Sequence, residues 1–170
     1  MRTPKFTARQ MALAALIGAL YVALSYFGSI FGLTYGPIQC RFSEALTVLP
    51  FLHPLAAWGL FAGCILSNLL SPYGPLDLIF GSLATLLAGL LTARCKNKYL
   101  APLPPVLCNG LIVGALIAFQ EVGFTAAFPG VFLFNCATVA LGEALACYVL
   151  GLPLLALVEK YRQRGLRSPS

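Results

Sequence analysis

The stretch FSEALTVLPFLH, residues 42–53, decides how many times this chain crosses a membrane. A helix that spans a bilayer needs about 20 apolar residues, and this stretch reaches His53-Pro54 after little more than half of that length. Joined to the apolar run behind it, residues 42–71 form one kinked helix and the chain has five spans. Taken alone, the stretch is a short second helix and the chain has six spans. The charges in the rest of the chain distinguish the two topologies.

Lysine and arginine favour the topology with six spans. With both termini inside, six spans place every basic residue except Arg41 on the inner side of the membrane. Five spans would put the basic groups at 94–98 and 160–167 outside, against the positive-inside rule. We therefore expect an all-α membrane protein of six transmembrane helices, a compact bundle with both termini cytoplasmic and His53 in an inner turn.

The composition excludes a water-soluble protein. Of the 170 residues, 59% are hydrophobic and only 9% are charged, whereas soluble domains carry about 25% charged residues. The formal charge of +6 comes from dispersed residues and does not indicate nucleic-acid binding. Six spans leave no room for a separate soluble domain, so residues 1–170 are expected to form a single integral membrane domain. Its helices are expected at about 10–28, 42–53, 55–71, 76–94, 104–121 and 129–159.

Missing motifs exclude several functions. The six cysteines contain no C-x-x-C pair and are typical of small buried hydrophobic residues, so we expect neither a metal site nor a cofactor. No G-x-x-x-x-G-K-[ST] loop is present, so the chain cannot hydrolyse ATP by itself. There is no G-x-S-x-G, and the single histidine lies at the wrong end to serve a serine in the outer half, so we expect no enzyme. The absence of an evident inverted repeat disfavours a self-sufficient carrier, which leaves a binding subunit of a larger transporter.

Polar residues gather near the outer ends of the predicted helices. Such groups are costly at membrane depth unless they are paired or line a cavity, which makes them candidates for substrate binding. Some have structural alternatives: Arg41 and Glu44 have the i, i+3 spacing of an ion pair, and Asp77 is placed to favour a helix dipole. The candidate binding residues are Gln39, Arg41, Glu44, Asn68, Tyr73, Asp77, Asn135 and Glu143.

Glu143 differs from the other carboxylates because it lies near the middle of a long apolar helix. An ionised carboxylate there needs a partner, or it must take up a proton. Asn135 and Thr138 have spacings that put them near the same helix face, so a polar stripe is expected along it. A role in a pocket or a structural hydrogen bond is one interpretation, and a proton relay is the other.

The first predicted helix carries a stripe of small residues with A-x-x-x-A spacing. Small residues four apart let helix backbones approach closely inside a bilayer. The stripe serves either packing within the chain or the docking of a second membrane protein. Its alanines are Ala8, Ala12, Ala15, Ala19 and Ala23, and Gly18 lies among them.

Three stretches resemble the queuosine-precursor transporter family, QueT: GPIQCRFSEALTVLPFL at 36–52, SNLLSPYGPLDLIFGSLATLLAG at 67–89 and GEALACYVLGLPLL at 142–155. Members of this family are substrate-binding S components of energy-coupling factor (ECF) importers in the plasma membrane of prokaryotes. The resemblance implies six helices, a lid loop between the first two, and an external pocket for a 7-deazaguanine or queuine. It also implies partners: a transmembrane coupling protein and two ATPases, docked partly through alanines of the first helix.

The chemistry of this substrate class assigns roles to the candidates. One carboxylate can accept from both N1–H and the exocyclic amine of a guanine-like edge, and the carbonyl of that edge needs a donor. We expect Glu44 or Glu143 to accept from the edge. Gln39 and Asn68 then assist, and Asp77 holds a cationic substituent. Rings for stacking are those of Tyr35, Tyr73 and Phe80. The alternatives are an S component for another vitamin and an independent ion-coupled transporter with Glu143 as its ion or proton site.

Overall fold

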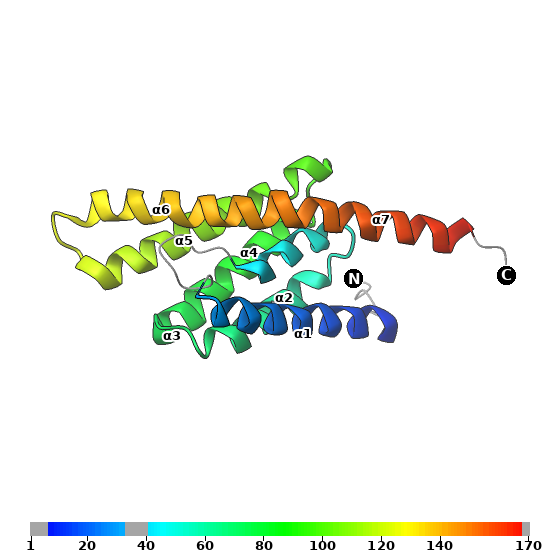
Figure 1. Cartoon of the computed structure of the whole chain (residues 1–170), viewed down its shortest axis with the longest axis horizontal. Coiled ribbons are helices and arrows are strands. Elements are labelled where there is room, and N and C mark those ends of the chain that lie inside the picture. Colours follow the sequence, from blue (N-terminus) through cyan, green and yellow to red (C-terminus); the bar gives the residue numbers. More distant parts are fainter. Residues whose placement is uncertain (1–6, 33–40, 168–170) are drawn as a thin grey trace, which may run out of the picture.

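The protein is all-helical over residues 7–32 and 41–167, the part of the chain that the computed structural model describes (Figure 1). The 3₁₀ helices are η1 and η3, and the π-helical segments are η2 and η4. α3, η2 and α4 follow one another without a break, as do α6, η4 and α7. The elements in chain order are α1 (Ala8–Ile30), η1 (Phe42–Phe51), α2 (Ala56–Asn68), α3 (Gly74–Leu76), η2 (Asp77–Gly81), α4 (Ser82–Thr92), η3 (Lys98–Leu100), α5 (Leu103–Val122), α6 (Phe128–Ala144), η4 (Leu145–Gly151) and α7 (Leu152–Arg167).

Within these residues, four helical segments are long and apolar enough to cross a membrane: Ala8–Ile30, Gly74–Thr92, Lys98–Val122 and Phe128–Gln163. The apolar helices η1 and α2 are shorter. The prediction of an all-helical chain with several apolar spans is confirmed. The count of six spans and the side on which the termini lie stay predictions.

Local sequence signals explain where the helices begin and end. Thr7 starts α1 with a capping box. The Thr7 hydroxyl accepts from the Gln10 backbone N–H, and the Gln10 side-chain oxygen accepts from the Thr7 backbone N–H. Pro75 stands in the first turn of α3, where a missing N–H costs little. α5 ends at Gly123, whose φ of +60° is a conformation that residues with a Cβ rarely adopt.

η1 lies at the centre of the bundle. In Figure 1 the continuous α6–η4–α7 segment forms one long edge of the molecule, and α1 lies at the opposite edge. α5 packs beside α6, α4 beside α5, and α2 beside both α4 and α1. η1 contacts α1, α4 and η4, and every residue from Ser43 to Pro50 is buried. The short apolar stretch is therefore a core element.

Small residues bring α1 and α2 into backbone contact. A Cβ at Gly59 would overlap the carbonyl oxygen of Ala14, and a Cβ at Gly63 would lie only 2.6 Å from that of Gly18. Ala14 and Gly18 are buried, so this face of α1 makes the close contact. The alanine stripe lies elsewhere on α1, and its members are exposed: Ala8, Ala12, Ala15, Ala19 and Ala23. Packing within the chain thus uses Gly18 and leaves these alanines exposed, and the docking of a second membrane protein by them stays a prediction.

Candidate functional site

Buried polar side chains surround η1. Those with less than a tenth of their surface exposed include Arg41, Glu44, Asn68, Asp77, Asn109 and Glu143. Two π-helical segments adjoin them, because η2 begins at Asp77 and η4 begins two residues after Glu143. π-helical turns are rare and occur frequently at functional sites. The irregular helices and the buried polar groups therefore point to the same region.

Arg41 makes its ion pair with Asp77. Its Nη2 lies 3.4 Å from Asp77 Oδ2, and its Nη1 donates to Asn68 Oδ1 at 3.4 Å. The ion pair between Arg41 and Glu44, one of the two interpretations of their spacing, is therefore wrong. Arg41 is the N-cap of η1 and has an extended backbone, with φ −85° and ψ 112°. Its side chain consequently does not follow the helical spacing on which an i, i+3 pair depends.

Asp77 joins several segments of the chain. Its Oδ2 also accepts a hydrogen bond of 2.6 Å from Ser71, and its backbone carbonyl accepts one of 3.1 Å from Asn68 Nδ2. A Cβ at Gly81 would overlap Asp77 Oδ1, so the glycine leaves room for this carboxylate. Asp77 Oδ1 is itself buried and has no hydrogen-bond partner among the described residues. Asp77 thus has one oxygen in the ion pair and one available acceptor.

Glu44 shows the same division between its two oxygens. Its Oε1 accepts from the hydroxyl of Tyr21, which is fully buried, and its Oε2 has no hydrogen-bond partner in the described part of the chain. A second bond between α1 and η1 joins Ser25 Oγ to Ser43 Oγ at 2.8 Å. α1 therefore fixes the orientation of η1 and, with it, the direction of the Glu44 carboxylate.

Cys64 connects Glu44 to the ion pair. Its sulfur accepts from Asn68 Nδ2 at 3.4 Å and lies 3.5 Å from Tyr21 Oη, whose proton is donated to Glu44. These contacts make one continuous network, which we call the η1 polar cluster, of Tyr21, Arg41, Glu44, Cys64, Asn68 and Asp77. Four of its members, Arg41, Glu44, Asn68 and Asp77, were predicted as binding residues. The structure brings them together from α2, η2 and the first turn of η1.

Glu143 belongs to a second group, on the η4 side of η1. Asn109 Nδ2 donates to Glu143 Oε1 at 2.8 Å, and the Cys147 thiol lies 3.8 Å from Glu143 Oε2. The same thiol donates to the backbone carbonyl of Glu44 at 3.3 Å, so the two groups adjoin. Asn109 was not among the predicted binding residues. The sequence does contain a signal for it, because Asn109 is a polar residue inside the apolar run LPPVLCNGLIVG.

Of the two other candidates, Asn135 lies apart from both groups, whereas the Tyr73 backbone N–H donates to Ser71 Oγ at 3.2 Å, and Ser71 in turn bonds to Asp77 Oδ2. Asn135 donates to Glu121 Oε2 and to its own helix at Val131, both at 3.1 Å, so the polar stripe expected between Asn135 and Glu143 is not one network. The backbone carbonyl of Tyr73 accepts from Gln120 Nε2 at 2.7 Å, which ties the turn before α3 to the end of α5. Gln39 and Tyr35 lie outside the described residues.

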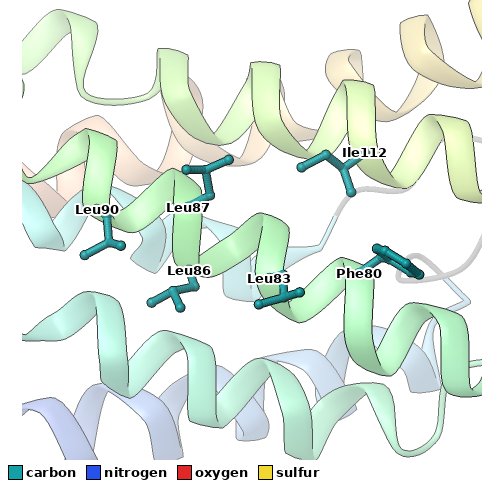
Figure 2. Close-up of a pocket in the computed structure, with 6 residues that line it drawn as sticks. All are labelled: Phe80, Leu83, Leu86, Leu87, Leu90 and Ile112. Atoms are coloured by element: carbon teal, nitrogen blue, oxygen red, sulfur yellow. The ribbon is translucent and has the colours of Figure 1, made fainter.

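A surface depression along α4 is separate from the polar residues. It has a volume of about 470 Å³ and is lined only by Phe80, Leu83, Leu86, Leu87, Leu90 and Ile112 (Figure 2). A guanine-like ligand needs hydrogen-bond partners that this lining does not provide. Phe80, considered as a stacking residue, therefore lies among leucines on the outward face of the chain and not in the η1 polar cluster.

Basic residues mark one end of the molecule. Burial lowers the pKa of His53, and the positive charges of Arg162 and Arg9 lower it further. The start of α1, the turn after η1 and α7 therefore meet at the same end. The turn before α5 joins them, because Lys98 Nζ lies 3.8 Å from Glu159 Oε2. We call this the basic end.

Comparison with known proteins identifies the family. The model of the QueT transporter family matches residues 11–160 of this chain. The chain is also similar to the queuosine precursor transporter QueT of Lactococcus lactis subsp. cremoris (strain MG1363), with 32% identity over 151 residues that cover 79% of this chain and 83% of that protein. No solved structure matches the chain. The protein is thus a multi-pass plasma-membrane protein that takes part in transport and is not an enzyme. Since the match includes η1 and nearly all of the described helices, the chain belongs to the QueT transporter family.

Proposed function

We propose that this chain is the substrate-binding membrane subunit, the S component, of an ECF-type importer for queuosine precursors. It captures a 7-deazaguanine or queuine in a pocket that opens outward and is closed by the loop between the first two helices. The observation that carries the proposal is the pair of buried carboxylate oxygens without partners in the η1 polar cluster, Glu44 Oε2 and Asp77 Oδ1. Buried acceptors of this kind are costly unless a ligand satisfies them.

The hydrogen-bonding groups of a 7-deazaguanine complement this cluster. Its N1–H and exocyclic amine are donors for Glu44 Oε2, and its carbonyl is an acceptor for Arg41 or Asn68. Because the ring has no N7, the bidentate contact that arginine makes with guanine cannot form. A single donor to the carbonyl is enough, which leaves Arg41 free to keep its contact with Asp77.

The charges of the cluster favour a cationic substrate. With both carboxylates ionised, Glu44 and Asp77 outnumber Arg41 by one negative charge. A buried charge without a counter-charge is strongly unfavourable. An aminomethyl group at position 7 supplies the counter-charge, and Asp77 Oδ1 is the acceptor that lacks a partner. We therefore assign the cationic substituent to Asp77.

The basic end supports six spans with both termini inside. His53, Arg9 and Arg162 interact electrostatically, so the start of α1, the turn after η1 and the last helix meet on one side. The pair of Lys98 and Glu159 adds the turn between α4 and α5. An even number of crossings explains all of these contacts, and the positive-inside rule then makes this end cytoplasmic.

The exposed alanine stripe supports docking to a partner in the membrane. Its members take no part in the close contact between α1 and α2, which uses Ala14 and Gly18. Small exposed residues four apart suit a second transmembrane helix. The partners are a transmembrane coupling protein and two ATPases, and the docking residues are Ala15 with Ala19 or Ala8 with Ala12.

Calorimetry on the purified protein in detergent tests the substrate assignment. We expect binding of 7-aminomethyl-7-deazaguanine, and no heat with riboflavin, thiamine or biotin, which represent S components for other vitamins. Absence of any heat with the deazaguanine at high protein concentration would contradict the assignment. In proteoliposomes, uptake is expected only when the coupling protein and both ATPases are present.

One observation favours a second function, an independent ion-coupled transporter. Glu143 and Asn109 form a buried hydrogen-bonded pair inside the bundle, and such a carboxylate can serve as a proton or ion site. That function requires uptake by the isolated chain under an ion gradient. Uptake without ATPases that Glu143→Gln abolishes would replace the S-component proposal with this one.

A further inference from the structure

The apolar depression of Figure 2 forms a groove along α4. Leu83, Leu87 and Leu90 follow one another at the i, i+4, i+7 spacing of a single helix face, and Ile112 of α5 lies beside them. About half of the surface of Leu83 and of Leu87 is exposed. In a membrane such a groove does not stay empty, because its lining would lose its dispersion contacts.

The groove has the length of one acyl chain in one leaflet. From Phe80 to Leu90 a helix rises about 15 Å, which is half of the hydrocarbon thickness of about 30 Å. Leu90 is close to the end of α4 at Thr92, so this end of the groove lies at the basic end of the molecule. The other end, at Phe80, reaches the middle of the bundle.

Two basic residues extend the same face beyond the groove. Arg94 follows Leu90 by four residues and Leu87 by seven, and its backbone N–H still bonds to Leu91 at 3.0 Å, so it continues the line of the groove. Lys96 follows two residues later, in the bend between α4 and η3. Both side chains are exposed. An exposed tyrosine, Tyr99, follows in η3 and marks the level of the membrane interface.

The chain itself offers these two charges no counter-charge. Of its five acidic residues, the buried ones are Glu44, Asp77 and Glu143. Glu121 lies at the opposite end of α5, and Glu159 is paired with Lys98. Within the described chain, Arg94 and Lys96 have no ion-pair partner. A negative charge from outside the protein is therefore the natural complement.

We propose that the groove and the two basic residues bind an anionic phospholipid. One acyl chain lies along Leu83, Leu87 and Leu90, and the phosphate lies between Arg94 and Lys96. Basic pockets beside transmembrane helices recognise anionic headgroups through this combination of charge and depth. The site is independent of the η1 polar cluster, so its failure would leave the proposed substrate binding untouched.

Native mass spectrometry with phosphatidylglycerol and phosphatidylcholine of identical acyl chains tests the site. Each basic residue near a membrane surface contributes about fivefold to anionic lipid binding, so Arg94→Gln/Lys96→Gln should weaken phosphatidylglycerol binding about thirtyfold. The matched control is Lys160→Gln/Arg162→Gln, which removes two exposed charges from the same end. Phosphatidylglycerol binding by the control should stay within about threefold of that of the unchanged protein, because the proposed lipid site does not include α7.

A second pair of variants tests the groove without changing charge. Leu87→Trp fills the groove and should lower the binding of both lipids, whereas Leu141→Trp replaces a similarly exposed leucine of α6 and should not. Substrate calorimetry on the same samples shows that each variant is folded. An equal loss of phosphatidylglycerol binding in Arg94→Gln/Lys96→Gln and in Lys160→Gln/Arg162→Gln would overturn the proposal. Unchanged lipid binding in both Arg94→Gln/Lys96→Gln and Leu87→Trp would also overturn it. That second result is expected if a protein helix covers the groove.

Discussion

Arg41 Nη2 lies 3.4 Å from the carboxylate of Asp77, a residue 36 positions further along the chain, and the pair is almost completely buried. Removing one member of a buried ion pair costs about 3–5 kcal/mol, because the other charge stays behind without a partner. Replacing both members by apolar residues of similar volume is often neutral. The pair therefore makes a clear prediction about stability.

Asp77→Asn should destabilise the protein by about 3 kcal/mol or more, measured as thermal or denaturant unfolding in detergent. The double variant Arg41→Met/Asp77→Leu should be more stable than Asp77→Asn, because the Arg41 guanidinium no longer stays buried without the carboxylate that it contacts. Glu121→Gln is the matched control: Glu121 is exposed, and its bond to Asn135 lies outside the cluster. A double variant at least as unstable as Asp77→Asn would show that the ion pair does not dominate.

Glu44→Gln should weaken substrate binding at least tenfold in calorimetry, since a charge-assisted hydrogen bond contributes about 1.5–3 kcal/mol. Glu143→Gln should change the affinity by less than about threefold, because Glu143 Oε1 already accepts from Asn109 and Glu143 lies in the second group, outside the η1 polar cluster. Tyr21→Phe is the control for the geometry of Glu44, since it removes only the hydroxyl that bonds to Oε1. The reverse order, with Glu143→Gln the more damaging, would move the recognition of the guanine edge to the second group.

A 7-aminomethyl-7-deazaguanine should bind about ten- to a hundredfold more tightly than its 7-cyano counterpart, because only the amine offers a cation to Asp77. The comparison by calorimetry needs no variant of the protein. In Asp77→Asn, at a temperature where circular dichroism shows it folded, the two ligands should bind with similar affinity. A preference that survives in Asp77→Asn would assign the cation to another group.

Gly59→Ala and Ala15→Leu should separate packing within the chain from docking to a partner. Gly59→Ala places a Cβ on the carbonyl oxygen of Ala14 and should destabilise the isolated protein by about 1–3 kcal/mol. Ala15→Leu adds bulk to an exposed position, so unfolding and substrate binding should be unchanged. Uptake by the complete importer should fall in Ala15→Leu. Normal uptake in that variant and in Ala19→Leu would exclude the stripe as the docking face.

Much of the helical fold follows from the sequence because it depends on local properties. Apolar runs and their breaks at proline and glycine predict helices that overlap those observed, and α1 begins at a capping box that Thr7 and Gln10 encode. The 3₁₀ form of η1 was not predictable in this way. It depends on burial against α1, α4 and η4, which no local pattern contains.

The candidate site shows the same division between local and distant information. The cost of polar groups in a membrane identified Arg41, Glu44 and Asp77 as functional candidates, and it would have identified Asn109 by the same rule. The partner of Arg41 could not be found from spacing, because Asp77 reaches it from another helix. Which face of α1 is buried also depends on α2, whose Gly59 and Gly63 meet Ala14 and Gly18 and not the exposed alanines.

The burial of η1 has a consequence for biogenesis. A helix of ten residues is too short to be inserted by its own hydrophobicity, and its contact from Cys147 to the Glu44 carbonyl joins positions 103 residues apart. We therefore expect η1 to become buried in the bundle only after the last helix has left the ribosome. In arrested nascent chains, a cysteine introduced at Thr47 should react with a water-soluble maleimide when the chain stops at Val122, and should be protected once it extends through Arg167.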